Sequence, residues 1–338
     1  MNIQIDPHQK IVIRLPNWVG DIAMLTPTLR NLRLAYPNNP MIGVGKGFCK
    51  DILSPNQIFD EFVALPGKSI IKNARALRHL KGGAGILFTN SFGSALEFFL
   101  AGMGPRIGYA NDGRSLFLSH AVPKLKVPMD QYYGHLGQLC GAKPVCDSLE
   151  LLTEQQSTEI ASHYLSKFDL RPGCKIIGLN PGAGFGETKR WFKEYFVELA
   201  KMSLKYDPEV RFFVFAGPGE EHLGEFIAQG IGDSAVPIWQ ANPGLNHIRA
   251  YIDRLSVMVT NDSGLRWYSL AKNIPTLVLF GSSDPNLTNC FTKHLLPLQH
   301  PVSCSPCKHR VCPTKHECML HLTPNNVFKI LKQTLDEI

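Results

Sequence analysis

Short apolar segments alternate with amphipathic segments along the first half of the chain. The apolar segments have the length of strands, and the segments between them place apolar residues at helical spacing. The predicted strands are 10–15, 41–44 and 84–88, and the predicted helices are 21–36, 68–80 and 91–101. This alternation indicates a parallel sheet that is covered by helices on both faces.

The same alternation begins again after residue 172. The predicted strands are 175–179, 211–216, 256–260 and 275–280, and the predicted helices are 191–204, 220–228, 263–271 and 325–338. Because the segment 166–172 separates the two series, we expect two doubly wound α/β domains, at 1–165 and 172–320.

The composition is typical of a globular protein, and the net charge limits the classes of partner that we expect. Hydrophobic residues make up 44% of the 338 residues and charged residues 19%, and no apolar segment approaches the roughly 18–20 residues that span a bilayer. The first residues lack the pattern of a secretory signal, so we expect a reducing cytosolic location. The net charge of +7 favours an anionic partner, such as a nucleotide, a phosphorylated lipid or a nucleic acid.

Ligands of doubly wound sheets bind beyond the carboxyl ends of the strands, which directs attention to the loops there. The loop 16–21 follows the first predicted strand, and it ends in Gly20 and Asp21. One interpretation makes Asp21 a helix N-cap, a common role for this residue type. The other makes it an exposed carboxylate that acts as a general base.

Two loops of the second half suit phosphate. The loop 180–191 is rich in glycine and ends in Lys189 and Arg190, and glycines let backbone N–H groups approach phosphate oxygens. It lacks the spacing of a Walker loop. In the loop 260–264, Asp262 or Ser263 can cap a helix, and backbone N–H groups there can face a phosphate. Two such loops at one sheet edge favour a diphosphate site.

Five segments carry a family resemblance. They are PNWVGD at 16–21, TNSFGSALEFFLAG at 89–102, RIGY at 106–109, NPGAGFGETKRW at 180–191 and TNDSG at 260–264. In this order they resemble the lipopolysaccharide heptosyltransferases of glycosyltransferase family 9. The resemblance implies a GT-B fold: two Rossmann-like doubly wound domains that face a central cleft. It further implies that 1–165 binds the acceptor, that 172–320 binds an ADP-sugar, and that the helix 325–338 packs back across the domains.

The resemblance also implies a reaction. Heptose would pass from ADP-L-glycero-β-D-manno-heptose to the lipopolysaccharide inner core, with inversion and with no cofactor required for catalysis. The expected partners are ADP-heptose, the lipid A–core oligosaccharide and, peripherally, the cytoplasmic face of the inner membrane. Asp21 matches the proposed catalytic base of the family. Lys189 matches the lysine that neutralises the leaving diphosphate, where charge grows in the transition state.

Further donor contacts are implied by the same matches. The expected donor-binding residues are Gly182, Gly184, Thr188, Arg190, Glu221, Asp262, Ser263 and Gly264. Glu221 would bind the ribose, with Glu220 as an alternative and a solvated helix residue as the plain interpretation. The turn 243–245 would line the adenine pocket. Relatives commonly carry His where this chain has Trp267, which leaves a different nucleotide-sugar open as the donor.

The acceptor is expected in the first half. Lys68, Lys72 and Arg75 form one helical stripe, which is a solvated basic face, a clamp for acceptor phosphates, or an attraction to an anionic membrane surface. The loop residues Asn90, Ser91 and Ser94 either hydrogen-bond the acceptor sugar or cap a helix.

A cysteine cluster lies near the end of the chain. Cys304, Cys307, Cys312 and Cys318 are close enough in sequence for a structural zinc site, for thiols packed in a loop, or for disulfides. A basic zinc-containing nucleic-acid-binding protein is therefore an alternative. Because the chain has no recognition-helix motif and no long basic run, we expect no nucleic-acid partner.

Overall fold

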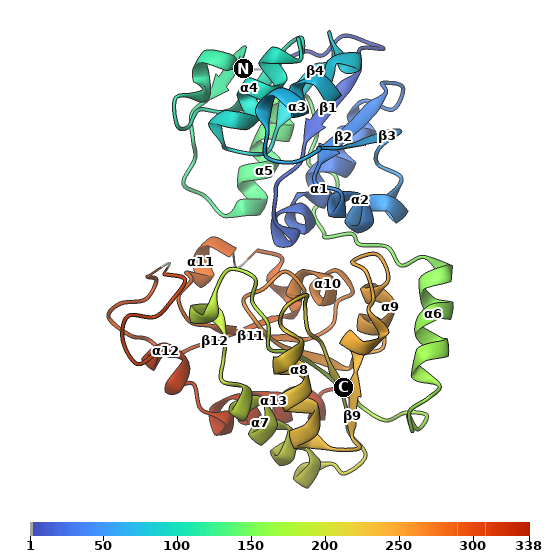
Figure 1. Cartoon of the computed structure of the whole chain (residues 1–338), viewed down its shortest axis with the longest axis vertical. Helices are drawn as coiled ribbons and strands as arrows, with labels where there is room; N and C mark the ends of the chain where they lie inside the picture. Colours follow the sequence, from blue (N-terminus) through green and yellow to red (C-terminus); the bar gives the residue numbers. More distant parts are fainter. Residues whose placement is uncertain (1–2, 289, 308) are drawn as a thin grey trace. The chain divides into compact units, whose positions relative to one another are not determined.

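The computed structural model describes residues 3–288, 290–307 and 309–338. The chain divides into two compact units, Met1–Leu151 and Leu152–Ile338, and each contains its own six-stranded parallel sheet (Figure 1). The predicted pair of doubly wound α/β domains is confirmed.

The first sheet has the strand order β3-β2-β1-β4-β5-β6. The strands are β1 (Ile11–Arg14), β2 (Met41–Gly45), β3 (Glu61–Ala64), β4 (Ala84–Leu87), β5 (Arg106–Tyr109) and β6 (His120–Val122). In the centre of the sheet, Ile11 of β1 is in register with Met41 of β2 and Ala84 of β4. The central strands are buried along their whole length because helices cover both faces.

Two groups of helices cover this sheet. On one face, α1 (Val19–Ala35) packs against α2 (Phe48–Leu53) and α5 (Met129–Leu139). On the other face, α3 (Ile70–Ala76) packs against α4 (Phe92–Leu100), which contacts the 3-10 helix η3 (Arg114–Phe117). Leu77 and Phe98 of this second group pack on Val12 and Leu87 of the strands.

The second sheet repeats the topology of the first. Its order is β12-β11-β10-β7-β8-β9. Read from the other edge, β9 to β12 take the places that β3 to β6 take in the first sheet, with β7 in the place of β1. The strands are β7 (Ile176–Asn180), β8 (Arg211–Val214), β9 (Ala235–Pro237), β10 (Val257–Asn261), β11 (Thr276–Phe280) and β12 (Leu295–Gln299). In both sheets the strand order reverses at the centre, between β1 and β4 in the first and between β7 and β10 in the second.

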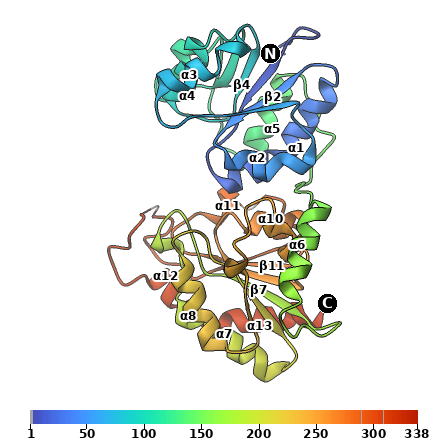
Figure 2. The ribbon, with the colours of Figure 1, turned by 45° about the vertical axis from the view of Figure 1, so that its right-hand side comes forward.

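The helices of the second unit are α6 (Gln155–Leu165), α7 (Lys193–Tyr206), α8 (Glu221–Ile231), α9 (Ile248–Ile252), α10 (Arg266–Ala271), α11 (Pro285–Thr288), α12 (Glu317–Leu320) and α13 (Pro324–Asp336). Figure 2 shows α7, α8 and α13 side by side against one face of the sheet. The final helix is confirmed, and its buried residues Val327, Leu331 and Leu335 join the core of this unit. Its packing across the domains stays a prediction.

The sequence-based prediction missed several elements, among them the inner strand β5, the helices α5 and α6, and the edge strands. The edge strand β3 is exposed or half-buried along its length, and β6 and β9 have only three residues each, so none of them forms a continuous apolar segment. The edge strand β12 contains Pro297, a residue that weakens a strand prediction. The division between the units lies before α6 rather than after it, because Ser157 and Tyr164 of this helix hydrogen-bond to His247 and Pro237.

Candidate active site

The glycine-rich loop after β7 is held in place by the carboxylate of Glu220. A Cβ on Gly182 would lie 2.0 Å from Oε2 of Glu220, so a larger residue here would displace the carboxylate from its present position. Oε1 of Glu220 accepts a hydrogen bond from the N–H of Ala183 at 2.9 Å and pairs with Arg190 at 2.6 Å. Glu220 therefore fixes the first and the last turn of the loop against each other.

A buried asparagine at the end of β10 holds the same loop from the other side. The amide of Asn261 donates to the carbonyl of Pro181 at 2.7 Å and accepts from the N–H of Trp191 at 2.9 Å. Both ends of the loop are thus tied to the strand next to β7. Asn261 was not singled out in the sequence, although a polar residue that ends a wholly buried strand is a signal for such a role.

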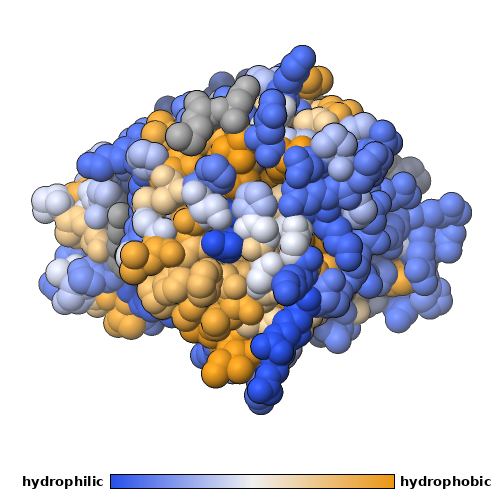
Figure 3. All heavy atoms as spheres, turned by 90° about the horizontal axis from the view of Figure 1, so that it is seen from above, coloured by the Kyte–Doolittle hydropathy of each residue, from blue (hydrophilic) through white to orange (hydrophobic). Residues whose placement is uncertain are grey.

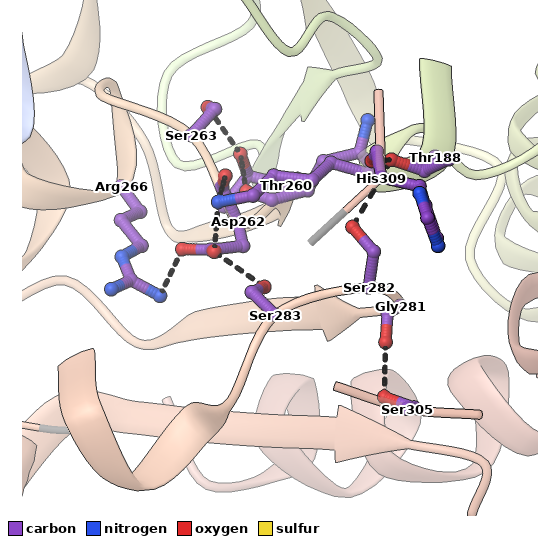
Figure 4. Close-up of polar contacts among 12 residues, drawn as sticks. Thr188, Thr260, Asp262, Ser263, Arg266, Gly281, Ser282, Ser283, Ser305 and His309 are labelled. Carbon is purple, nitrogen blue, oxygen red and sulfur yellow. Dashed lines mark hydrogen bonds and ion pairs between the residues drawn. The ribbon is translucent and has the colours of Figure 1, made fainter. Parts of the chain in front are cut away.

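A cluster of charges lies where the two loops meet (Figure 4). Oδ2 of Asp262 is 2.5 Å from the ammonium of Lys189 and accepts from the hydroxyl of Ser283 at 2.6 Å. Oδ1 of Asp262 is 2.8 Å from the guanidinium of Arg266. The carboxylate is therefore shared between two cations from different segments. Arg266 was noticed in the sequence only as a neighbour of Trp267, and Ser283 was not noticed at all.

The balance of charge in this cluster is positive. Burial raises the pKa of Asp262, but Arg266 and Lys189 outweigh that effect and hold the pKa below its ordinary value. One carboxylate between two cations leaves one positive charge in excess. The side chain of Lys189 keeps 19% of its surface exposed, and its ammonium also lies 5.3 Å from the ring centre of Phe185. An anion that approaches this loop would meet Lys189.

The other expected donor-binding residues have different surroundings. The hydroxyl of Ser263 accepts a hydrogen bond from Asn180 at 2.7 Å. Thr188 is buried, and its hydroxyl contacts the carbonyl of His309 and the hydroxyl of Ser282. The predicted helix 263–271 begins only at Arg266, so Ser263 and Gly264 lie in the turn that precedes it.

A cavity of about 150 Å³ lies beyond the end of β8. Its lining includes Glu221, Trp239 and Pro243. That Glu221 binds the ribose and the turn 243–245 the adenine stays a prediction. The carboxylate of Glu221 is exposed, and its pKa is lowered because it accepts hydrogen bonds from its own N–H and from that of Gly219. Since Glu220 is committed to the glycine-rich loop, Glu221 is the acid that remains available at the cavity.

In the first unit, Asp21 is not the N-cap of its helix. The cap position belongs to Trp18, which makes no side-chain capping hydrogen bond. Asp21 lies in the first turn of α1 and is half-buried. Its Oδ1 accepts a hydrogen bond from the hydroxyl of Tyr133 at 3.1 Å. The N-cap interpretation is corrected, because the helix starts two residues before the carboxylate.

The loop after β4 is joined to Asp21 through α5. Tyr132, the neighbour of Tyr133, donates its hydroxyl to the side-chain oxygen of Asn90 at 3.0 Å. Ser91 caps α4, since its hydroxyl accepts from the N–H of Ser94 at 3.4 Å. Ser94 is buried, and its hydroxyl contacts Ser91 and Thr89. Two successive tyrosines thus bring the loops after β1 and β4 together.

The predicted basic stripe lies on and beside α3. Ser69 caps this helix by accepting from the N–H of Lys72 at 3.4 Å. Lys68, Lys72 and Arg75 are all exposed. These three cations make no ion pair with an acidic side chain among those that the described residues form. The stripe is therefore an unneutralised basic surface.

The cysteine cluster surrounds a cavity of about 290 Å³ that also touches Thr188, Ser282 and His316. Cys304, Cys307, Cys312 and Cys318 are free thiols. Burial, together with the other three cysteines, raises the pKa of Cys318 to about 11. Among residues 3–288, 290–307 and 309–338, no group of three or more Cys, His, Asp or Glu side chains is arranged to hold a metal ion.

Comparison with known proteins agrees with this architecture. Residues 70–317 match the family model described as glycosyltransferase family 9 (heptosyltransferase). The chain belongs to glycosyltransferase family 9. Membership confirms the predicted glycosyltransferase activity, and with the two parallel sheets it confirms the two Rossmann-like domains of the GT-B fold.

Individual family 9 proteins are similar along nearly the whole chain. Lipooligosaccharide heptosyltransferase 2 of Campylobacter jejuni is 27% identical over 96% of this chain and 98% of its own. The structure of Escherichia coli ADP-heptose lps heptosyltransferase II has a TM-score of 0.79 at 23% identity, covering 97% of this chain and 99% of that chain. A family 9 glycosyltransferase from Veillonella parvula has a TM-score of 0.85 at 18% identity, with both chains fully covered.

The charge cluster generates a prediction on stability and pH. We expect Asp262→Asn to destabilise the second unit by about 3 kcal/mol or more, because it leaves the buried Arg266 without its anion. The pKa of Asp262 is depressed in the folded state, so its contribution is present above the unfolded value of about 4 and is lost as the pH falls through the folded value.

Thermal melts of wild type and Asp262→Asn between pH 7 and pH 3 test this expectation. The difference in melting temperature should be largest near pH 7 and should shrink in acid. A difference that stays constant across this range would contradict the ionised state of Asp262.

Proposed function

We propose that this enzyme transfers heptose from ADP-L-glycero-β-D-manno-heptose to the inner core of lipopolysaccharide. The observation that carries the proposal is the cationic cluster of Lys189, Asp262 and Arg266 at the ends of β7 and β10, which suits a diphosphate. The relatives match this chain over nearly their full length and are named heptosyltransferases, which supports heptose as the transferred sugar.

In the proposed reaction, Lys189 stabilises the ADP that leaves. Negative charge grows on the diphosphate as the glycosidic bond breaks, and a fixed cation close to that charge lowers the barrier. Asp262 and Arg266 hold Lys189 at the edge of the loop. Gly182 and Gly184 keep side chains away from the loop backbone, while Ser263 and Gly264 offer N–H groups. Arg190 acts through Glu220, to which it is bound.

The proposed base is Asp21. Its carboxylate would take the proton from the acceptor hydroxyl while that oxygen attacks the anomeric carbon, so the reaction is one displacement with inversion. The proton ends on Asp21, and the bonding electrons leave with ADP. Tyr133 would orient the carboxylate through its hydrogen bond. These residues supply the catalysis in our proposal, with no cofactor required.

The acceptor side rests on the loop after β4 and on α3. We propose that Asn90 and Ser91 contact the acceptor sugar, with Ser94 holding the hydroxyl of Ser91. The stripe of Lys68, Lys72 and Arg75 would attract the phosphates of the lipid A–core acceptor. Such an acceptor places the enzyme at the cytoplasmic face of the inner membrane, as a peripheral protein without a nucleic-acid partner. No helix within the described residues is long and apolar enough to cross a bilayer.

Trp267, which replaces the His that relatives commonly carry, allows a second candidate for the donor substrate: an ADP-sugar other than ADP-heptose. The indole is buried, and its ring centre lies 4.3 Å from the guanidinium of Arg266. Trp267 thus supports Arg266 by a cation–π contact and affects the donor site through it. The cationic cluster suits any ADP-sugar, and heptose is preferred because the similar family 9 proteins are named heptosyltransferases.

The cysteine cluster is proposed to support the donor loop. Its segment contacts Thr188, directly before Lys189, through the carbonyl of His309 and the ring of His316, whose Nε2 lies 2.9 Å from the Thr188 carbonyl oxygen. We propose that the four thiols close around their cavity and bind structural zinc when it is present. Four cysteines are a sufficient ligand set for zinc.

The donor proposal predicts a nucleotide preference. Calorimetry should show that ADP binds the protein more tightly than UDP or GDP does. Lys189→Ala should reduce turnover by about 10²-fold or more. It should lower the melting temperature less than Asp262→Asn does, because Arg266 still pairs with the carboxylate of Asp262. Tighter binding of UDP would contradict the assignment of an ADP-sugar.

The base proposal predicts a loss of turnover without a loss of stability. Asp21→Asn should lower kcat by about 10²–10⁴-fold, because the amide cannot accept the proton but can still accept the bond from Tyr133. The assay is ADP release from ADP-heptose with a heptose-bearing core acceptor, beside a thermal melt. Tyr133→Phe is the matched control, and it should lose less. Near-normal turnover of Asp21→Asn would leave the mechanism without a base.

The cysteine proposal predicts a change in stability. Cys304→Ser should lower the melting temperature, whereas Cys174→Ser, outside the cluster, should not. A stable Cys304→Ser protein that loses only kcat would overturn the structural role. Elemental analysis of protein purified without chelator should find about one zinc per chain if zinc is bound. A protein free of zinc would exclude the metal.

A further inference from the structure

Large apolar side chains project into solvent on the α3–α4 face of the first unit. Leu116 is 84% exposed and Ile71 62% exposed, and Phe92, Phe99 and Leu100 are each exposed by more than two fifths. They come from α3, α4 and η3, which pack against one another. We call this set of five residues the apolar patch.

Aromatic contacts join the patch into one surface. The ring of Phe117 lies 5.2 Å from that of Phe92 and 5.4 Å from that of Phe99, measured between ring centres. Leu116 directly precedes Phe117. On the side of α3, a Cβ on Gly93 would lie 3.5 Å from the side chain of Ile70, the neighbour of Ile71. The patch therefore extends from η3 over α4 to α3.

Basic residues border the patch. Lys68, Lys72, Arg75, Arg78 and Lys81 are all exposed. Lys81 lies against the end of α4, because a Cβ on Gly102 would be 3.2 Å from its side chain. Glu97 of α4 is buried beside Arg14 and Asn73 and adds no negative charge to the surface. Asp112, four residues before Leu116, is exposed, and the exposed Glu61 pairs with His79, so the five cations outnumber the acidic residues near the patch.

Figure 3 looks onto the end of the first unit where Figure 1 places α3 and α4. It shows a broad group of hydrophobic residues with a band of hydrophilic residues along one side. An exposed apolar group of this kind is uncommon on a soluble monomer unless it contacts something else. Because cations predominate beside the apolar patch, an anionic surface is the partner that its charge favours.

We propose that the apolar patch and the basic residues beside it form the surface by which this protein docks on an anionic phospholipid bilayer. Aromatic and aliphatic side chains enter the interfacial region of a bilayer, and Lys and Arg are attracted to anionic headgroups. Stable peripheral binding needs two such signals together, and this face carries both.

The inference rests on the proposed function in one respect. If the acceptor is anchored in the membrane by lipid A, the enzyme must reach the membrane surface to act on it. Binding to vesicles can nevertheless be measured whether or not the enzyme transfers heptose. The basic stripe of the first unit then has a double use: its cations attract headgroups as well as acceptor phosphates.

Flotation with lipid vesicles tests the proposal. Wild-type protein should float with vesicles of phosphatidylethanolamine and phosphatidylglycerol, and far less with vesicles of phosphatidylcholine alone. The double variant Phe99→Ser, Leu116→Ser should lose at least about tenfold in partitioning, since it removes two inserted side chains. Leu34→Ser is the matched control, because Leu34 is 60% exposed on α1, on the opposite face of the sheet.

The electrostatic part has its own variant. Arg78→Glu with Lys81→Glu should lose at least about tenfold in partitioning to the anionic vesicles. Lys50→Glu with Lys143→Glu changes the net charge equally, outside α3, and should float like wild type. Thermal melts of all variants show whether each remains folded.

The flotation results can be told apart from a failure of the proposed heptosyltransferase activity. Phe99→Ser, Leu116→Ser should still release ADP from ADP-heptose with a lipid-free core oligosaccharide. Wild-type protein that fails to float, or a patch variant that floats like wild type, would overturn the membrane surface and leave the patch to a protein partner. Flotation as expected without any ADP release would overturn the heptosyltransferase proposal and keep the docking surface.

Discussion

The second unit is organised around the buried carboxylate of Asp262. A carboxylate that is withdrawn from water is costly unless cations and hydrogen bonds replace its hydration, and here Arg266, Lys189 and Ser283 do so. These partners come from α10, from the glycine-rich loop and from the end of β11. One charge thus draws together segments from three places in the chain, and it sets where the ammonium of Lys189 can lie.

The constraints on the loop itself follow the same logic. Glu220 and Asn261 hydrogen-bond to the backbone of Pro181, Ala183 and Trp191 and so hold the loop in place. The glycines between these points add no side chains that would cover the loop backbone. The sequence showed the glycines, the two cations and the position after a strand. It did not show Glu220, Asn261 and Arg266 as partners, because their contacts bridge segments whose distance in space a sequence pattern does not encode.

Much of the fold could be predicted from the sequence, since buried parallel strands such as β7 and β11 are continuous apolar segments. The edge strands β3 and β6 were less visible because few of their residues are buried. In the first unit, Asp21 and Asn90 were recognised from their motifs, but the link between them was not. That link consists of Tyr132 and Tyr133 on α5, a helix that the sequence-based prediction missed, and both hydrogen bonds bridge segments far apart in the chain.

The dependence of Thr188 on His309 has a consequence for synthesis of the chain. The two residues are 121 positions apart, and α13, which completes the same core, ends at Asp336. The first unit is contiguous and closes its sheet with its own residues by Leu151, so it can fold while the ribosome still makes the rest. The loop that carries Lys189 emerges early in the second unit but gains its contact with His309 only after that residue has been made. A truncated or stalled chain would therefore contain a folded first unit beside a donor site that has not yet formed.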